Sequence, residues 1–189
     1  MIVWHVCISG FRQNAGRVNG VLRLWRERIR LLTDGDTYTC YRPWDSDWRE
    51  LASFINLTRE PGRPLRVGIY GFSYGAGWGA MQLARALRRS ALSVDAMVLA
   101  DPVYRHGLRS LAWLSLVRCP VIRVPSNVRW VRYLLQRETI PRGHRLIASE
   151  GAGTVIERPR IVRLPHIAMD DYLGWHELAE ETAYGLHAR

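Results

Sequence analysis

Lysine is absent from this chain of 189 residues, so arginine supplies all 27 of its lysine-plus-arginine positions. The formal net charge of +10 favours anionic partners, such as a phospholipid surface or an acidic polymer. The arginines are scattered along the chain and form no single basic block. We therefore predict no specific nucleic-acid partner, whereas an anionic surface or polymer stays open as a partner.

Cysteine is scarce, and long apolar runs are missing. The three cysteines, Cys7, Cys40 and Cys119, are widely spaced and form no CxxC pair, which predicts reduced thiols in a cytoplasmic protein. No stretch approaches the ~20 apolar residues of a membrane-spanning helix, and the first residues show no secretory signal pattern. The phosphate-binding GKS/T, the HExxH pattern and Cys/His clusters are also absent, so we expect no metal and no nucleotide cofactor.

Short apolar segments alternate with segments of helical periodicity. We expect strands at residues 2–9, 37–42, 65–72, 93–103, 119–125 and 160–166, and helices between them, including one over 128–138. Near-continuous apolar strands that alternate with helices are typical of a parallel sheet covered on both faces. The sequence therefore predicts a single α/β domain over residues 1–189. Its expected form is a three-layer α/β/α sandwich with a mostly parallel sheet of about six strands.

Residues 71–75 read GFSYG, a GxSxG pentapeptide that follows a predicted strand and precedes a predicted helix. A serine hydroxyl is a poor nucleophile until a neighbouring base takes its proton, and it must stand clear of the sheet on a sharp turn. Side chains at Gly71 and Gly75 would collide with the adjoining strand and helix. The strand–turn–helix context favours Ser73 as a catalytic nucleophile over a chance match to the pattern.

With this context, the segment VGIYGFSYGAG resembles the α/β-hydrolase superfamily. The resemblance extends over nearly the whole chain and implies a minimal member with no large cap and an open, cutinase-like or thioesterase-like cleft. It implies the strand order 2-1-3-4-5-6 for the six strands above, and catalytic partners in the order serine, acid, histidine. Residues 105–118 are either a small lid or a helix that covers the sheet.

The resemblance places the catalytic base between the last strand and the last helix. Of six histidines, only His166, in LPHIAMDD, stands at that position. His5 lies inside the first strand, where we expect it to be packed. His144, in an irregular segment, is the second candidate for the base.

The acid should also stand at a strand end, where Asp101 is found in MVLADPVYR. Many members of the superfamily carry the acid one strand later, but VPSNVRW at that point contains no carboxylate. Certain thioesterases and lipases of the superfamily use the earlier position. A carboxylate there would accept the second imidazole N–H and fix its tautomer. Asp101 could instead cap the following segment, and Glu150 and Glu157 are alternative acids.

The resemblance also implies an oxyanion hole of backbone N–H groups, which Tyr74 and Phe11 would supply, with Arg12 as the next choice after Phe11. Aromatic side chains in the loops that follow the strands could form the wall of an acyl site. Trp44 and Tyr104 are the candidates, and ordinary loop packing is the alternative.

Together these residues predict a serine hydrolase that cleaves a small or lipid-like carboxylic ester or thioester through an acyl-enzyme on Ser73. The alternative is a catalytically silent binding protein of the same fold, whose basic surface meets an anionic partner. Acyl length, leaving group and oligomeric state stay open.

Overall fold

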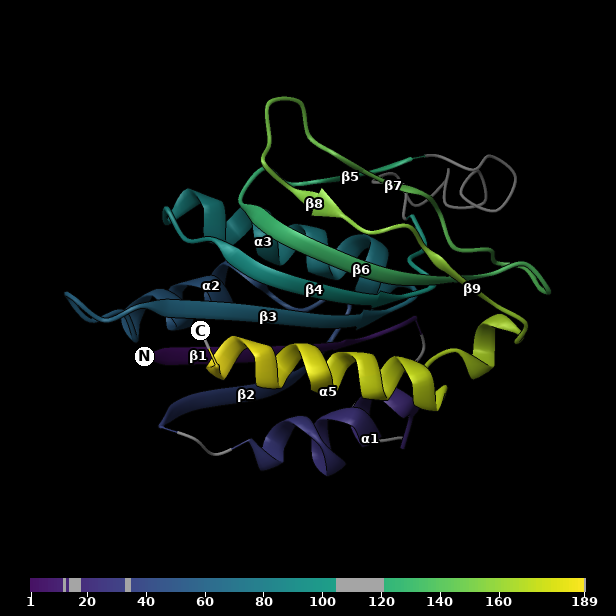
Figure 1. Cartoon of the computed structure of the whole chain (residues 1–189), viewed down its shortest axis with the longest axis horizontal. Helices are drawn as coiled ribbons and strands as arrows, with labels where there is room; N and C mark the ends of the chain where they lie inside the picture. Colours follow the sequence, from purple (N-terminus) through teal and green to yellow (C-terminus); the bar gives the residue numbers. More distant parts are fainter. Residues whose placement is uncertain (12, 14–17, 33–34, 105–120, 189) are drawn as a thin grey trace.

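The computed structural model describes residues 1–11, 13, 18–32, 35–104 and 121–188 (Figure 1). Its main sheet has the order β2-β1-β3-β4-β6-β8, and β9 also pairs with β6. The strands are β1 (Ile2–Ser9), β2 (Asp36–Pro43), β3 (Leu65–Phe72), β4 (Val94–Ala100), β6 (Val128–Gln136), β8 (Val155–Ile156) and β9 (Arg160–Val162). The pairs described between these strands are parallel. The predicted α/β class with a mostly parallel sheet is therefore confirmed.

Helices lie on both faces of the sheet (Figure 1). On one face lie α1 (Gly20–Glu27) and α5 (Leu173–His187), and on the other lie α2 (Trp48–Leu57) and α3 (Ala80–Arg89). All eight residues of β1 are buried, because helices cover the central strands on both sides. The apolar residues Trp175, Leu178 and Ala179 are buried in α5.

Residues 128–138, predicted as a helix, contain the central strand β6, so that prediction was wrong. The segment is rich in valine and aromatic residues, which favour strands, and it lies between β4 and the outer strands β8 and β9. The last four residues of β6 are all buried. A stretch that is buried on both faces shows no alternation of polar and apolar residues, so periodicity alone does not distinguish it from a helix.

The segment predicted as the fifth strand of the main sheet lies outside that sheet. Its described part forms β5 (Ile122–Val124), which pairs with β7 (Leu146–Ala148) in a separate two-stranded sheet. In the predicted order 2-1-3-4-5-6, the place next to β4 therefore belongs to β6.

Two of the three cysteines are described, and both carry free thiols: Cys7 is buried and Cys40 is half-buried. Cys119 and the segment 105–118, the predicted lid or covering helix, lie outside the described residues. Within the described ranges, no helix is both long enough and apolar enough to cross a membrane.

Candidate active site

Ser73 lies on a sharp turn between β3 and the start of the next helix. Its φ of 54° is in the left-handed region, which a residue with a side chain rarely adopts. The flanking glycines make this turn possible. A Cβ at Gly71 would lie 2.9 Å from the Cα of Ala76, and a Cβ at Gly75 would overlap the carbonyl oxygen of Ile8. The expectation that side chains at Gly71 and Gly75 would collide with their neighbours is confirmed.

Three backbone hydrogen bonds hold the Ser73 turn. The Ser73 N–H donates to the carbonyl oxygen of Ala100 at 3.0 Å. The Ser73 carbonyl oxygen accepts from the N–H groups of Gly77 at 2.9 Å and Val103 at 3.0 Å. A strained backbone conformation is retained only where surrounding contacts hold it in place. At Ser73 these contacts come from the start of the helix, from the end of β4 and from the loop after β4.

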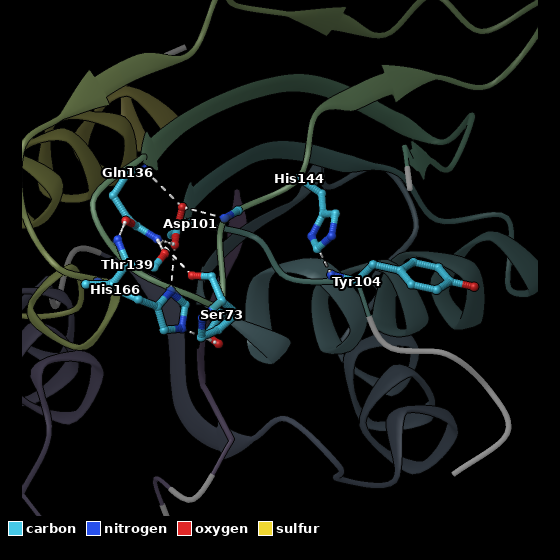
Figure 2. Close-up of polar contacts among 9 residues, drawn as sticks. Ser73, Asp101, Tyr104, Gln136, Thr139, His144 and His166 are labelled. Atoms are coloured by element: carbon cyan, nitrogen blue, oxygen red, sulfur yellow. Dashed lines mark hydrogen bonds and ion pairs between the residues drawn. The ribbon is translucent and has the colours of Figure 1, made fainter. Parts of the chain in front are cut away.

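Ser73, His166 and Asp101 form one chain of hydrogen bonds (Figure 2). Ser73 Oγ lies 2.9 Å from His166 Nε2, and His166 Nδ1 lies 2.6 Å from Asp101 Oδ2. A carboxylate only accepts hydrogen bonds, which assigns the imidazole proton to Nδ1 and leaves Nε2 to accept the serine hydroxyl proton. The geometry therefore provides a serine hydroxyl beside a base that a buried carboxylate orients.

Asp101 is completely buried directly after β4 and also has a positive φ, of 43°. Its N–H donates to the carbonyl oxygen of Leu134 at 2.8 Å. Its Oδ1 accepts from the backbone N–H of Gln136 at 3.0 Å and from that of Gly143 at 2.9 Å. A Cβ at Gly143 would overlap Oδ1, so this contact requires glycine. Burial of a charged group is tolerated when such donors surround it.

His166 begins a short 3₁₀ turn (His166–Ala168) between β9 and α5. Its backbone N–H donates to Thr139 Oγ1 at 2.7 Å, and its ring stacks on that of Phe72, with centroids 4.9 Å apart. Phe72 directly precedes the nucleophile, so this stacking also sets the position of the imidazole relative to Ser73.

The other candidates for base and acid lie elsewhere. His144 Nδ1 accepts the backbone N–H of Tyr104 at 3.0 Å and faces Tyr104, not Ser73 (Figure 2). Glu157 pairs with Arg132 at 3.4 Å, and Glu150 is exposed in a turn.

The loop after β1 passes close to the nucleophile. A Cβ at Gly10 would lie 3.0 Å from Ser73 Cβ, so the loop backbone at Gly10 runs against Ser73. Gln13 holds this loop, because its Oε1 accepts the Gly10 N–H at 2.9 Å and its Nε2 donates to Asp170 Oδ2 at 2.6 Å. Burial raises the pKa of Asp170, against the opposing effect of hydrogen bonds that its carboxylate accepts. Arg12 lies outside the described residues.

Three aromatic rings gather beside Ser73, and we call Phe11, Trp44 and Tyr74 the aromatic group. Their ring centroids lie 5.5 to 6.0 Å apart in each of the three pairs. Trp44 is 9% exposed and forms the buried part of the group, whereas Phe11 is 52% exposed. Tyr104, the other predicted substrate contact, is half-buried beside His144.

Sequence reasoning missed the polar residues that support the site: Gln13, Gln136, Thr139 and Asp170. Their roles depend on which loops meet at the ends of β1, β4 and β6, and no local motif marks them. Over the part of the chain that the structure describes, no group of three or more histidine, cysteine or acidic side chains could hold a metal ion. A comparison with protein-family models finds no match, and a comparison with curated proteins also finds none.

Proposed function

We propose that this protein is a serine hydrolase of α/β-hydrolase type that cleaves a carboxylic ester or thioester. The observation that carries the proposal is the hydrogen-bond chain from Ser73 Oγ through His166 to Asp101, with the serine on a strained turn after a parallel strand. Serine, acid and histidine follow each other along the chain in the order that this superfamily uses.

The proposed reaction begins when Ser73 Oγ attacks the acyl carbon and its proton moves to His166 Nε2. Asp101 accepts the Nδ1–H of the resulting imidazolium and stabilises its charge. Backbone N–H groups of Tyr74 and Phe11 would hold the oxyanion of the tetrahedral intermediate. The C–O or C–S bond then breaks, and Nε2 returns the proton to the leaving alcohol or thiol. Water attacks the acyl-enzyme by the same route, which releases the acid and regenerates Ser73.

The aromatic group favours an acyl ester with an apolar portion as substrate. Tyr74 adjoins the nucleophile, and the exposed face of Phe11 offers apolar surface that a substrate can cover. Trp44 contacts both rings in edge-type arrangements and is largely inaccessible itself. Tyr104, which lies beside His144, remains a predicted substrate contact.

The alternative function is that of a catalytically silent binding protein with a basic surface for an anionic partner, which the net charge of +10 suggests. A long distance between Ser73 Oγ and His166 Nε2 would favour this alternative. Their contact at 2.9 Å favours the hydrolase instead.

A fluorophosphonate probe and a series of p-nitrophenyl and coenzyme A esters of increasing acyl length test the proposal. We expect the probe to label Ser73, and Ser73→Ala to lose labelling and at least about 10³-fold in kcat. Ser53→Ala is the matched control, because Ser53 is exposed on α2 and its hydroxyl bonds only within that helix. Undiminished hydrolysis by Ser73→Ala, with no probe on Ser73, would refute the proposal.

A further inference from the structure

The side-chain amide of Gln136, the last residue of β6, is completely buried next to Asp101. Its Nε2 lies 3.0 Å from Asp101 Oδ2, 2.9 Å from the carbonyl oxygen of Thr139 and 2.8 Å from that of Pro141. Its Oε1 accepts the backbone N–H of Thr139 at 2.9 Å. The amide is therefore bonded on both ends.

These partners determine which way the amide faces. Three acceptor oxygens surround Nε2, and one N–H donor faces Oε1. The two N–H groups of Nε2 are shared among these three acceptors. A flipped amide would place its oxygen against three oxygens and its NH2 against an N–H, and it would lose the interactions at both ends. The NH2 group of Gln136 is thus directed at the Asp101 carboxylate.

The same segment reaches the base as well as the acid (Figure 2). Gln136 donates to both carboxylate oxygens of Asp101, from its backbone N–H and from Nε2. Thr139, which the Gln136 side chain binds at two backbone atoms, accepts the backbone N–H of His166 through Oγ1. Residues 136–139 consequently connect Asp101 to His166 by a route separate from their direct bond.

We propose that Gln136 is a positioning residue that sets the orientation of the Asp101 carboxylate toward His166, an inference that rests on the proposed function. Oδ2 of Asp101 accepts from both His166 Nδ1 and Gln136 Nε2. The amide therefore limits rotation of the carboxylate about the Cβ–Cγ bond of Asp101. Asp101 is fully buried, where losing a donor is costly. Without the amide, Oδ2 would keep only His166 Nδ1–H among the donors that the described residues provide, so the carboxylate would hold the imidazole less firmly.

Gln136→Met and Gln136→Glu test this role with opposite chemistry at nearly constant size. Gln136→Met removes the donor, and we expect kcat to fall about 10- to 100-fold with little change in KM, because the residue does not contact substrate. Gln136→Glu places a second carboxyl group against Asp101, and the pair is tolerated only while it shares a proton. We therefore expect the ratio of Gln136→Glu to wild-type kcat to rise as pH falls, a trend that a purely structural role would not produce.

Thr139 provides a second pair of variants, because it is exposed and its substitution should leave the fold intact. Thr139→Val removes the oxygen that accepts the His166 N–H, and we expect a several-fold lower kcat. Thr139→Ser keeps the oxygen and should restore kcat. Equal kcat values for both Thr139 variants would show that the bond from Thr139 to His166 does not contribute. If Gln136→Met does not fold, Gln136→Glu decides, and a ratio of its kcat to the wild-type kcat that does not change with pH would overturn the inference.

A proton NMR measurement separates failure of the inference from failure of the proposed function. An imidazole N–H in a short bond to a carboxylate gives a far-downfield resonance, which His166→Gln would identify by its disappearance. We expect folded Gln136→Met to shift or lose this signal. If wild type shows the signal but no hydrolysis, and Gln136→Met shifts it, the positioning role stands and the hydrolase proposal fails. If wild type hydrolyses esters and folded Gln136→Met keeps both the signal and kcat within about twofold, the hydrolase proposal stands and the positioning role fails.

Discussion

Val103 donates its backbone N–H to the carbonyl oxygen of Ser73 at 3.0 Å, which joins the loop after β4 to the nucleophile turn. The Ser73 N–H returns a bond to Ala100, the residue before Asp101. Ser73 and Asp101 both have positive φ angles, and these two bonds connect the strained turn at Ser73 to the segment that carries Asp101. Backbone hydrogen bonds therefore help to fix the position of Ser73 relative to Asp101, in addition to the side-chain contacts.

Gly77→Ala should disrupt the backbone contact between the Ser73 turn and the loop after β4. A Cβ at Gly77 would overlap the carbonyl oxygen of Val103, and the backbone of both segments would have to move. We expect the free energy of unfolding, measured by urea denaturation, to fall by about 1–3 kcal/mol and ester hydrolysis to fall with it. Gly185→Ala is the control, because Gly185 is exposed in α5 and a Cβ there meets nothing within 4 Å. The free energy of unfolding of Gly185→Ala should rise by up to about 1 kcal/mol. Equal stabilities of the two variants would contradict the prediction.

Asp101→Asn should abolish most activity with little change in shape. An asparagine cannot serve as acceptor for all the donors around Asp101, and it no longer stabilises an imidazolium at His166. We expect kcat to fall about 10³- to 10⁴-fold, measured with the ester that wild type hydrolyses fastest. Asp36→Asn removes an exposed carboxylate that pairs with Arg63 and should leave kcat unchanged. Comparable kcat values for the two variants would show that Asp101 has no role in catalysis.

Phe11→Ala should change which acyl chains are preferred. The exposed part of the Phe11 ring offers apolar area only to a substrate long enough to reach it. We expect kcat/KM to fall about tenfold for long acyl esters and little for acetyl esters, since one apolar contact is worth about 1–3 kcal/mol. Phe54→Ala is closely matched, because Phe54 is 51% exposed on α2 and makes no contact in the aromatic group. A uniform loss at all acyl lengths would speak against substrate contact by Phe11.

His5 should make the fold sensitive to acid. Its ring nitrogens lie 3.0 Å from the Tyr70 hydroxyl and 3.0 Å from His187 Nε2. Burial, followed by the charge of His187, lowers the pKa of His5 from 6.5 to about 3. The folded state therefore binds fewer protons than the unfolded state between these values. Stability from the neutral His5 ring is complete above pH 6.5 and declines as pH falls toward 3.

Urea denaturation at two pH values measures this effect. We expect His5 to contribute about 2–3 kcal/mol to the fall in unfolding free energy between pH 7 and pH 4.5, at about 1.4 kcal/mol per pH unit. His5→Gln cannot titrate, so its stability should decline less over the same range, whatever its stability at pH 7. An identical decline in the two proteins would show that His5 is not responsible.

The local pattern was sufficient for the turn at Ser73, and it placed His166 and Asp101 first among several candidate partners. GFSYG after an apolar run predicts a tight turn because only glycine leaves room for the neighbouring backbone at positions 71 and 75, and the structure shows those contacts. Carboxyl ends of parallel strands meet at one edge of a sheet. Asp101 and His166, each placed at the end of a predicted strand, could therefore be expected near Ser73.

The sequence by itself determined the class of fold, because apolar periodicity is a local property, and it favoured Ser73, His166 and Asp101 over the other candidates for the site. Only the tertiary structure decided that residues 128–136 form the strand beside β4. That pairing brings Gln136 and the following turn to Asp101, and it brings Thr139 to His166. Such contacts depend on pairing between distant strands, whose free energy comes from shared burial and not from any neighbouring residue along the chain. For this reason the contact between Gln136 and Asp101 could be identified only from the tertiary structure.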